Sequence, residues 1–480
     1  MTNGKEAPRR ESGRAAGSGR GTGKREYRRA EPDAARRAAF DTLNAVAARD
    51  AYANLVLPGM LRERGITGRD AAFATELAYG TLRTRGTLDA VLAECSSRPL
   101  AEIDPRVIEM LRLGAYQLLR TRVPAHAAVS ATVDVARVAL TDGPARFVNA
   151  VLRRVSEKDE ETWIAQVAPS RESNPSGHLA IRYAHPEWIV RAFADALGGD
   201  LAETEAALAA DDARPAVHLV ARPGLVTREE LMAQAGGSPG PYSPYAVHLD
   251  GGDPAAFPLI AGGRAGVQDE GSQLCAIALA TAPIDGPDAA WLDLCAGPGG
   301  KAALLGALAA GRGAQVTAVE IAEHRAKLVS QSTGGLPVTV VTADGRDVGE
   351  HPALAEGSFD RVLVDAPCTG LGALRRRPEA RWRRQPTDMP ALTKLQRELL
   401  TAALRAVRPG GVVAYVTCSP HLAETKVTAA DAARRTGAQV LDARELLPGV
   451  PDLGPGPTVQ LWPHRHGTDA MFLSVLRRPS

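Results

Sequence analysis

Two cysteines that follow strand-like apolar runs are the residues of this sequence best placed to do chemistry. The motif Asp-Ala-Pro-Cys, which ends at Cys368, follows an expected strand over Arg361–Asp365. The motif Thr-Cys-Ser around Cys418 follows a second expected strand over Gly411–Val416. The thiolate is the nucleophilic form of cysteine, and open α/β sheets bind ligands beyond the carboxyl ends of their strands. Two thiols at such ends indicate covalent catalysis.

A glycine-rich loop upstream of both thiols has the composition of a cofactor-binding loop. It follows an expected strand over Trp291–Leu294 and comprises Cys295, Ala296, Gly297, Pro298, Gly299, Gly300 and Lys301. Its glycines let the backbone turn sharply and approach a ligand closely. Glu320, at the end of the next strand, can accept hydrogen bonds from a ribose diol. Asp344, which ends the third strand, can accept one from the amino group of an adenine.

The acids at the strand ends favour one cofactor over another. The first four strands end at Asp293, Glu320, Asp344 and Asp365. Four carboxylates in register suit the cationic sulfonium of S-adenosylmethionine better than a pyrophosphate. The spacing Gly297-x-Gly299-x-x-Ala302 also fits the relaxed dinucleotide pattern, so a nicotinamide-dependent dehydrogenase is the alternative, although it gives no reason for two thiols. A P-loop is excluded because Ala302 replaces the Ser or Thr that binds magnesium.

Cytosine C5 methylation is a reaction that needs these residue types. C5 is a poor nucleophile until a thiolate adds at C6, after which C5 can attack a sulfonium methyl group and β-elimination releases the thiol. An acid that contacts N3 and the exocyclic amine assists, and Asp365, three residues before Cys368, is placed for that role. The spacing alone leaves open which of Cys368 and Cys418 attacks. Cys95 and Cys275 are expected to be buried apolar residues.

The overall composition excludes several classes of protein. The chain has 480 residues and five scattered cysteines without a CxxC pair, so neither a disulfide framework nor a metal site is expected. Neither a long apolar run nor a signal peptide is evident, and we expect a cytoplasmic protein without a membrane partner. Residues 1–30 hold nine Lys and Arg against three Glu, a net charge of +6. This basic tail should be disordered; a tether for RNA phosphates and a solubilising role fit it equally.

The rest of the chain divides into three expected domains. Residues 31–166 show helical periodicity, in which Phe40, Leu43 and Ala47 recur on one face, and form an all-α domain. Residues 174–177, Asn-Pro-Ser-Gly, have the composition of a linker. Residues 178–263 combine a long helix over Glu187–Ala209 with a short strand over Ala216–Ala221 and a Gly/Pro-rich stretch over Gly236–Pro254, a small α+β module.

Residues 266–480 alternate between strands and helices, which predicts a parallel, doubly wound Rossmann-like sheet. The remaining expected strands are Gln315–Glu320, Pro337–Ala343, Thr458–Leu461 and Ala470–Leu476, and the expected helices are Lys301–Ala310, Glu323–Val329, Ala391–Val407 and His421–Arg435.

A cluster of arginines follows the fourth strand of this domain. It comprises Arg375, Arg376, Arg377, Arg381, Arg383 and Arg384 and surrounds Trp382. Arginines and a tryptophan beside a catalytic cleft can hold phosphates and stack a displaced base, so we expect this segment to bind RNA.

Taken together, these motifs resemble the RsmB/Sun-type 16S rRNA (cytosine-C5)-methyltransferases. The order Asp-x-Cys-Ala-x-Pro-Gly-Gly-Lys, Asp-Ala-Pro-Cys and Thr-Cys-Ser carries the resemblance, which covers most of the chain. Tyr-Ala-Asn-Leu at residues 52–55 and Tyr-Gly at 79–80 are similar to an N-terminal NusB-like RNA-binding domain, as His-Pro-Glu-Trp at 185–188 and Gln-Asp-Glu-Gly-Ser-Gln at 268–273 are to the remainder. The chain departs from the common motif at Gly297, where Ala is usual, at Ala302, where Thr is usual, and at Glu320, where Asp is usual.

The resemblance implies roles that the residues alone leave open. It makes Cys418 the nucleophile and Cys368 the thiol that assists product release, whereas DNA cytosine methyltransferases attack with the Pro-Cys thiol. It implies S-adenosylmethionine as cofactor, and 16S rRNA before completion of the subunit as substrate for a monomeric enzyme that acts on no DNA. The same chemistry on tRNA is one alternative; a NusB-like RNA-binding or antitermination factor without catalysis is the other.

Overall fold

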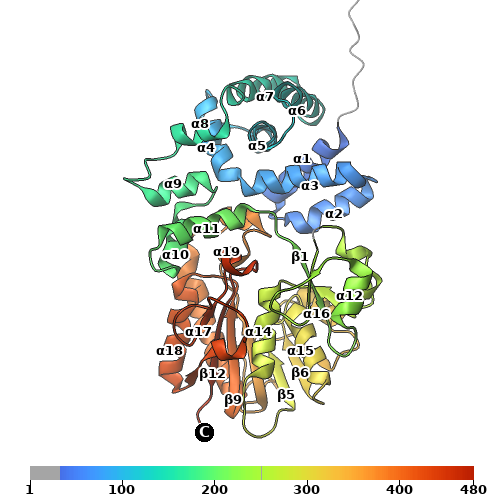
Figure 1. The fold of residues 1–480 in the computed structure, drawn as a ribbon, viewed down its shortest axis with the longest axis vertical. Helices are drawn as coiled ribbons and strands as arrows, with labels where there is room; N and C mark the ends of the chain where they lie inside the picture. The colour runs from blue at the N-terminus through green and yellow to red at the C-terminus, as the bar shows by residue number, and fades with distance from the viewer. Residues whose placement is uncertain (1–32, 250) are drawn as a thin grey trace, which may run out of the picture.

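A helical region stands on a region that contains the sheets in the computed structural model, which describes residues 33–249 and 251–480 (Figure 1). The expected basic tail over residues 1–30 lies outside the described residues. The helical region consists of α1 (Ala34–Arg49), α2 (Ala53–Glu63), α3 (Gly68–Arg83), α4 (Arg85–Cys95), α5 (Pro105–Arg120), α6 (Ala125–Ala139), α7 (Asp142–Val155) and α8 (Glu160–Val167).

One apolar core holds the helical region together. Phe40 and Leu43 of α1 are fully buried against Leu111 of α5 and Leu152 of α7. Ala47, expected on the same face of α1, is exposed instead. Helices with one apolar stripe gain most of their stability from packing that stripe, so the core fixes the arrangement of this region.

Three further helices connect this region to the sheets. They are α9 (Pro175–Arg182), α10 (Glu187–Ala196) and α11 (Leu201–Asp212). The stretch expected to be a linker starts α9, because the Asn174 side chain caps the helix by accepting from the Gly177 N–H. The single helix expected over Glu187–Ala209 is two helices, since Gly198 and Gly199 adopt positive φ angles of 72° and 84° and Asp200 caps α11.

The middle module contains a small antiparallel sheet in the order β2-β3-β1-β4. Its elements are β1 (Val217–Ala221), α12 (Arg228–Ala235), β2 (Ser238–Pro239), β3 (Ala246–Leu249), α13 (Pro258–Ala261) and β4 (Ala265–Val267). The Gly/Pro-rich stretch therefore carries two strands. Because β4 pairs with β1, the small sheet extends to Val267 and ends directly before the large sheet's first helix.

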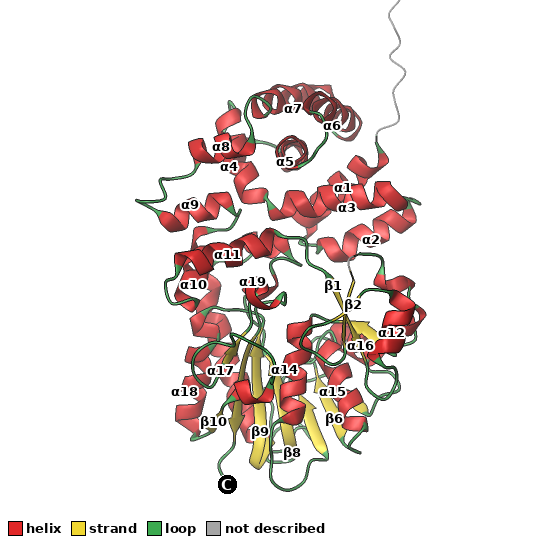
Figure 2. Cartoon of the chain, in the orientation of Figure 1, coloured by secondary structure: helices red, strands yellow, loops and turns green. Residues whose placement is uncertain are grey.

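The large sheet has the order β10-β12-β9-β8-β5-β6-β7, with β11 paired to β12 (Figure 2). Its strands are β5 (Ala290–Asp293), β6 (Gln315–Val319), β7 (Val338–Val341), β8 (Phe359–Asp365), β9 (Val407–Thr417), β10 (Gln439–Leu441), β11 (Val459–Gln460) and β12 (Phe472–Arg477). The helices are α14 (Glu270–Thr281), α15 (Gly300–Ala310), α16 (Glu323–Ser332), α17 (Met389–Ala406), α18 (Lys426–Thr436) and α19 (Pro463–His466).

This sheet is buried on both faces, as parallel sheets are. Trp291 of β5 packs into the core on one face and its neighbour Leu292 into the core on the other. Strands β5 to β9 run parallel and β12 runs antiparallel to β9. The multidomain fold class expected from the sequence, with a doubly wound sheet at its C-terminal end, is confirmed; β10 was not expected.

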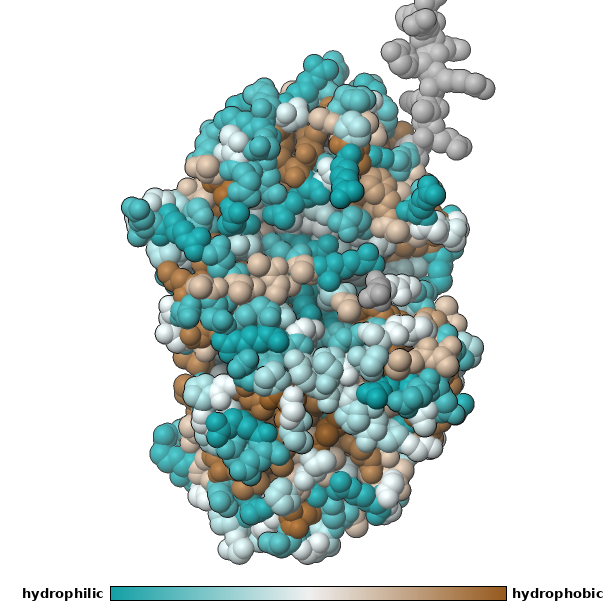
Figure 3. Space-filling model, viewed as in Figure 1, coloured by the Kyte–Doolittle hydropathy of each residue, from teal (hydrophilic) through white to brown (hydrophobic). Residues whose placement is uncertain are grey.

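The strand order reverses between β5 and β8, because β5 is followed by β6 on one side and β8 lies on the other. Ligands of doubly wound sheets bind at such a switch point, beyond the carboxyl ends of the strands. In the space-filling view, hydrophilic side chains cover much of the visible face and apolar ones emerge between them in both regions (Figure 3). Of the residues that the structure describes, no helix is both long and apolar enough to cross a membrane.

Candidate active site

The two thiols expected at strand ends lie in direct contact. Strands β8 and β9 are parallel neighbours, with Asp365 paired to Val416, so the loops that follow them leave the sheet side by side. The Cys368 and Cys418 sulfur atoms are 3.4 Å apart. The sequence placed both cysteines at one edge of the sheet, and the fold brings residues 50 positions apart within hydrogen-bonding distance.

The contact makes the two thiols unequal. The hydrogen bond between them lowers the pKa of the Cys418 thiol. The same hydrogen bond, together with burial, raises the pKa of Cys368 well above its usual value. Among the charged neighbours of Cys418, the Lys301 ammonium group favours its thiolate. Cys418 is therefore the sulfur that ionises more readily, a distinction that the spacing of the motifs did not provide.

An ion pair joins the glycine-rich loop to the thiol loops. The Lys301 Nζ, in the first turn of α15, lies 2.8 Å from the Asp365 Oδ2 at the end of β8. Although burial opposes its charge, the Asp365 carboxylate raises the pKa of Lys301. Asp365 is thereby fixed three residues before Cys368, and its carboxylate retains further acceptor capacity for a ligand.

The glycine-rich loop connects β5 to α15 and packs against the end of β6. The Gly297 N–H donates to the Glu320 Oε2 at 3.1 Å, and the Ala322 N–H donates to its other oxygen at 3.0 Å. A Cβ atom at Gly297 would lie 2.1 Å from that Oε2. Gly297 and Glu320, two of the three departures from the common motif, are therefore sterically matched to each other.

The other loop residues serve packing and backbone geometry. Burial raises the pKa of the Cys295 thiol well above its usual value, which disfavours its thiolate. Ala296 is buried, the Pro298 carbonyl accepts from the Ser332 hydroxyl, and Gly300 begins α15. The loop thus presents backbone to the switch point.

Asp344 is already engaged. Arg346 donates to both of its carboxylate oxygens, with a closest distance of 2.6 Å, and also pairs with Glu398. These hydrogen bonds lower the pKa of Asp344. Its oxygens lie at the expected strand end, and a bound adenine would have to share them with Arg346.

Asp293, one of the four strand-end acids, and Ile321, to which the sequence reasoning gave no role, lie at the same edge. Asp293 is fully buried, and its Oδ2 has no hydrogen-bond partner among the described residues. Burial, followed by the charge of Asp365, raises its pKa to about 7. Ile321, directly after Glu320, is 64% exposed. It offers an apolar face beside the acid that is expected to accept hydrogen bonds from a ribose. An apolar residue after the strand-end acid was the available signal for Ile321.

Two thiols lie outside the site, as expected. Cys95 belongs to α4 and Cys275 to α14, and both are buried. Burial raises the pKa of Cys95 to about 11 and that of Cys275 to about 12. In the described part of the chain, no group of three or more His, Cys, Asp and Glu side chains could hold a metal ion.

The arginine segment (residues 375–384) differs from its expected role. Arg381 is fully buried and donates to the Arg83 carbonyl at 2.8 Å and to Asp212 at 2.8 Å. Arg383 donates to the Ala51 carbonyl at 2.6 Å. These contacts tie the segment to the helical region, so most of its donors are not free to bind phosphates.

The first two arginines of the segment are bound in the same way. Arg375 and Arg376 both pair with Asp269, which precedes α14, and with Asp469, which precedes β12. Arg376 also donates to the Ala216 carbonyl of the middle module at 2.9 Å. Trp382 packs on the backbone at Gly86. The expectation that this whole segment binds RNA is wrong for Arg375, Arg376, Arg381 and Arg383, because their guanidinium groups bind other parts of the fold.

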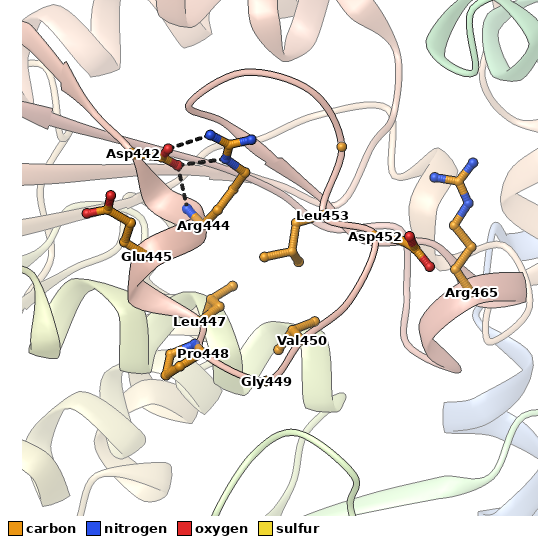
Figure 4. A pocket seen from close by; sticks show the side chains of 11 residues that line it. Asp442, Arg444, Glu445, Leu447, Pro448, Gly449, Val450, Asp452, Leu453 and Arg465 are labelled. Atoms are coloured by element: carbon orange, nitrogen blue, oxygen red, sulfur yellow. Dashed lines mark hydrogen bonds and ion pairs between the residues drawn. The ribbon is translucent and has the colours of Figure 1, made fainter.

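A separate surface hollow of about 710 Å³ lies in the loop between β10 and β12. The close-up shows Asp442 and Arg444 paired with each other at its rim, and Leu447, Val450 and Leu453 nearby (Figure 4). None of the strand-end residues lines it. It brings no nucleophile or cofactor contact to the site.

Comparison with known proteins assigns the two halves of the chain. Residues 278–477 match the family described as 16S rRNA methyltransferase RsmB/F, and residues 33–157 match the NusB family. A Mycobacterium tuberculosis protein named only as a candidate methyltransferase is 61% identical over 452 residues, which cover 94% of this chain and 98% of that relative. Ribosomal RNA small subunit methyltransferase B of Salmonella paratyphi B is 35% identical over 374 residues, 76% of this chain and 81% of that one.

A solved structure matches the fold over nearly the whole length. The crystal structure titled PH0851 has a TM-score of 0.77 at 22% identity, and the match covers 94% of this chain and 99% of that chain. This likeness confirms the fold, a helical region followed by a sheet-bearing region.

Proposed function

The chain belongs to the RsmB/F family of 16S rRNA methyltransferases, and we propose that it methylates C5 of one cytosine in 16S rRNA. Family membership makes it an S-adenosylmethionine-dependent RNA methyltransferase. The observation that carries the finer proposal is the contact of the Cys368 and Cys418 thiols at 3.4 Å, beside the Lys301–Asp365 ion pair.

In the proposed reaction Cys418 is the nucleophile. Its thiolate forms a bond to C6 of the cytosine while the Lys301–Asp365 pair gives a proton to N3 through Asp365, so that the C5–C6 electron pair becomes a C4–C5 double bond. Asp365 also contacts the exocyclic amine, and N3 returns the proton to it once C5 is methylated. After C5 is methylated, loss of the C5 proton to a base restores the double bond and breaks the Cys418–C6 bond. The readier ionisation of Cys418 supports this assignment over attack by Cys368.

Cys368 is the proposed aid to product release. Its sulfur lies against that of Cys418, so it is within reach of the bond that must break. Its raised pKa keeps it in the thiol form, in which it can donate a hydrogen bond to the departing Cys418 sulfur.

The strand-end edge fits S-adenosylmethionine, which when bound supplies the methyl group on a sulfonium. Glu320 offers carboxylate oxygens and Ile321 an exposed apolar face beside them. Asp293 contributes a buried carboxyl oxygen without a partner among the described residues. The glycine-rich loop, residues 295–301, would supply backbone contacts, and Asp344 an acceptor for the adenine amino group.

The remaining domains are proposed to dock RNA. The NusB-like region and the middle module stand above the carboxyl edge of the large sheet (Figure 1). A base enters such a site only when it is unstacked, which favours 16S rRNA before the subunit is complete. The proposed enzyme acts as a monomer in the cytoplasm. A tRNA substrate is the alternative. A non-catalytic NusB-like factor would have no use for the two contacting thiols.

Mapping of 5-methylcytosine by bisulfite sequencing tests the proposal. RNA from a deletion strain should lose one methylated cytosine in 16S rRNA, and the purified full-length protein with S-adenosylmethionine should restore it on the deproteinised rRNA. Loss of a tRNA position instead would establish the tRNA alternative. If no cytosine changes in either RNA, the C5 chemistry is refuted.

A further inference from the structure

A buried carboxylate lies behind the two thiols and is not part of the proposed chemistry. Glu424, in the turn before α18, is fully buried. It accepts hydrogen bonds from the Thr369 N–H at 2.8 Å and the Thr369 hydroxyl at 2.5 Å. It also accepts from the Ser419 hydroxyl at 2.6 Å and from the Gln396 amide at 3.0 Å.

Two of the residues that donate these hydrogen bonds are the neighbours of the two thiols in the sequence. Thr369 follows Cys368, and Ser419 follows Cys418. One carboxylate thus binds the residue next to each thiol, and the Thr369 and Ser419 hydroxyl groups also contact each other at 3.2 Å. Four hydrogen bonds to a buried anion hold their partners tightly, because bonds to charged groups are the strong ones.

The hydrogen bonds of Glu424 also connect it to α17 and to β9. Gln396 of α17, which donates to Glu424, also donates to the Pro367 carbonyl at 2.9 Å, just before Cys368. The Tyr415 hydroxyl of β9 donates to the Glu424 backbone carbonyl at 2.7 Å. The position of Glu424 is therefore fixed by the helix and the strand that flank the thiol loops.

The charges around the thiols are arranged unequally. The negative charge of Glu424 acts on Cys368, whereas Cys418 experiences the positive charge of Lys301 and the negative charges of Asp365 and Asp469. The groups that face the pair are Asp365, Lys301, Asp469, Glu424 and the Tyr415 phenol. The Asp365 and Asp469 carboxylates raise the pKa of Cys418 and Lys301 only partly offsets them, so the hydrogen bond with Cys368 is the contact that lowers the pKa of Cys418.

We propose that Glu424 is a positioning residue that holds the two loops so that the Cys368 S–H donates to the Cys418 sulfur, which makes Cys418 the attacking thiol. The inference rests on the proposed covalent chemistry and explains which of two thiols performs it. Glu424 touches neither substrate nor cofactor. It acts through Thr369 and Ser419 and through its charge.

Alkylation of the free enzyme tests this role without turnover. The rates at which iodoacetamide modifies Cys418 and Cys368 are measured from pH 6 to 10 by peptide mass spectrometry. In the wild type, Cys418 should react faster and at lower pH. In Glu424→Gln, which keeps the shape and loses the charge, the preference for Cys418 should fall about tenfold, the change expected from one pKa unit.

The choice of variants separates positioning from packing. Glu424→Asp keeps the charge in a shorter side chain, and it should retain more of the preference for Cys418 than Glu424→Gln does. A purely packing role predicts the reverse order. Ser419→Ala removes one donor on the Cys418 side with little loss of volume. Glu270→Gln, which removes a buried carboxylate bound to the Tyr242 and Ser243 amides, is the matched control and should leave the preference unchanged.

Adduct mapping distinguishes failure of the inference from failure of the proposed function. RNA that contains 5-fluorocytidine blocks loss of the C5 substituent and traps the protein–RNA bond, and mass spectrometry locates the cysteine. We expect only Cys418 in the wild type and a share of Cys368 in Glu424→Gln. A wild-type adduct on Cys418 with unaltered selectivity in both Glu424 variants overturns the inference alone. No adduct on either cysteine in the wild type overturns the covalent chemistry itself.

Discussion

The carboxyl edge of the large sheet and the arginine segment behind it contain equally suggestive residues, but the fold uses them in opposite ways. At the strand ends, the Cys418 sulfur has only Cys368 as a hydrogen-bond partner within residues 33–249 and 251–480, and Asp293 retains an oxygen without a partner there. In the arginine segment, Arg381 donates to four backbone carbonyls and a carboxylate while fully buried. Residue type indicates chemistry only where the fold leaves the group's bonding capacity unused.

The largest expected effect comes from a substitution at the strand ends. Cys418→Ala removes the proposed nucleophile, so transfer of a labelled methyl group to 16S rRNA should fall by more than about 10⁴-fold. Trapped adduct should vanish with it. Cys368→Ala should still form the adduct and release it slowly, seen as a retarded band on a denaturing gel. Cys95→Ala, in the helical region, is the control. The opposite pattern for the two thiols would reassign the nucleophile to Cys368.

Much of the strand-end edge could be predicted from the sequence because each of its residues is fixed by local signals. Apolar runs locate β5, β8 and β9, and parallel neighbours bring their ends together, so Asp365, Cys368 and Cys418 had to be near one another. Which of the two thiols ionises more readily could not be predicted. It depends on a sulfur–sulfur contact and on Lys301 and Glu424, which only the folded chain brings to them.

The role of the arginine segment could not be predicted from local sequence signals. Arg381 finds its partner carbonyl at Arg83, 298 residues away, and Arg383 finds Ala51, 332 residues away. Nothing in the spacing of six arginines distinguishes donors used by a distant domain from donors left for phosphate. The break between α10 and α11 was more accessible, because Gly198 and Gly199 followed by Asp200 are an end signal and a start signal.

Asp365→Asn should give the next largest effect. The amide cannot pass a proton from Lys301 to N3, and it removes the charge that pairs with Lys301. Product formation should fall about 10² to 10⁴-fold, the usual contribution of acid–base groups, and the adduct should be lost as well. Asp442→Asn, an acid at the separate surface hollow, serves as the matched control. Adduct formation at the wild-type rate in Asp365→Asn would show that Asp365 acts only after attack.

Arg381→Ala tests the arginine side of the comparison through stability. The Asp212 carboxylate and the Arg83 carbonyl would be left buried without their donor, so the free energy of unfolding should fall by about 3 to 5 kcal/mol. Arg384→Ala, in the same segment, should change it by less than about 0.5 kcal/mol. Urea unfolding followed by circular dichroism measures both. Equal effects of the two substitutions would contradict the structural role assigned to Arg381.

The smallest expected effect concerns Glu320, a strand-end residue whose oxygens, like the donors of the arginines, already form hydrogen bonds within the fold. Its Oε2 occupies the space of a Cβ atom at Gly297, and the common motif pairs Ala with Asp at these two positions. Gly297→Ala alone should displace Glu320 and weaken S-adenosylhomocysteine binding about tenfold, or about 1.4 kcal/mol. Glu320→Asp in the same background removes the closest of these contacts, and the flexible Arg325 side chain, whose Nη2 lies 2.8 Å from that Cβ position, can move aside. The double variant should therefore bind within about threefold of the wild type. Calorimetry measures Gly297→Ala, Glu320→Asp and the double variant, with Gly311→Ala as control because a Cβ there meets only ordinary contacts. Additive losses in the double variant would mean that the two departures are independent and that Glu320 is held by something other than the glycine-rich loop.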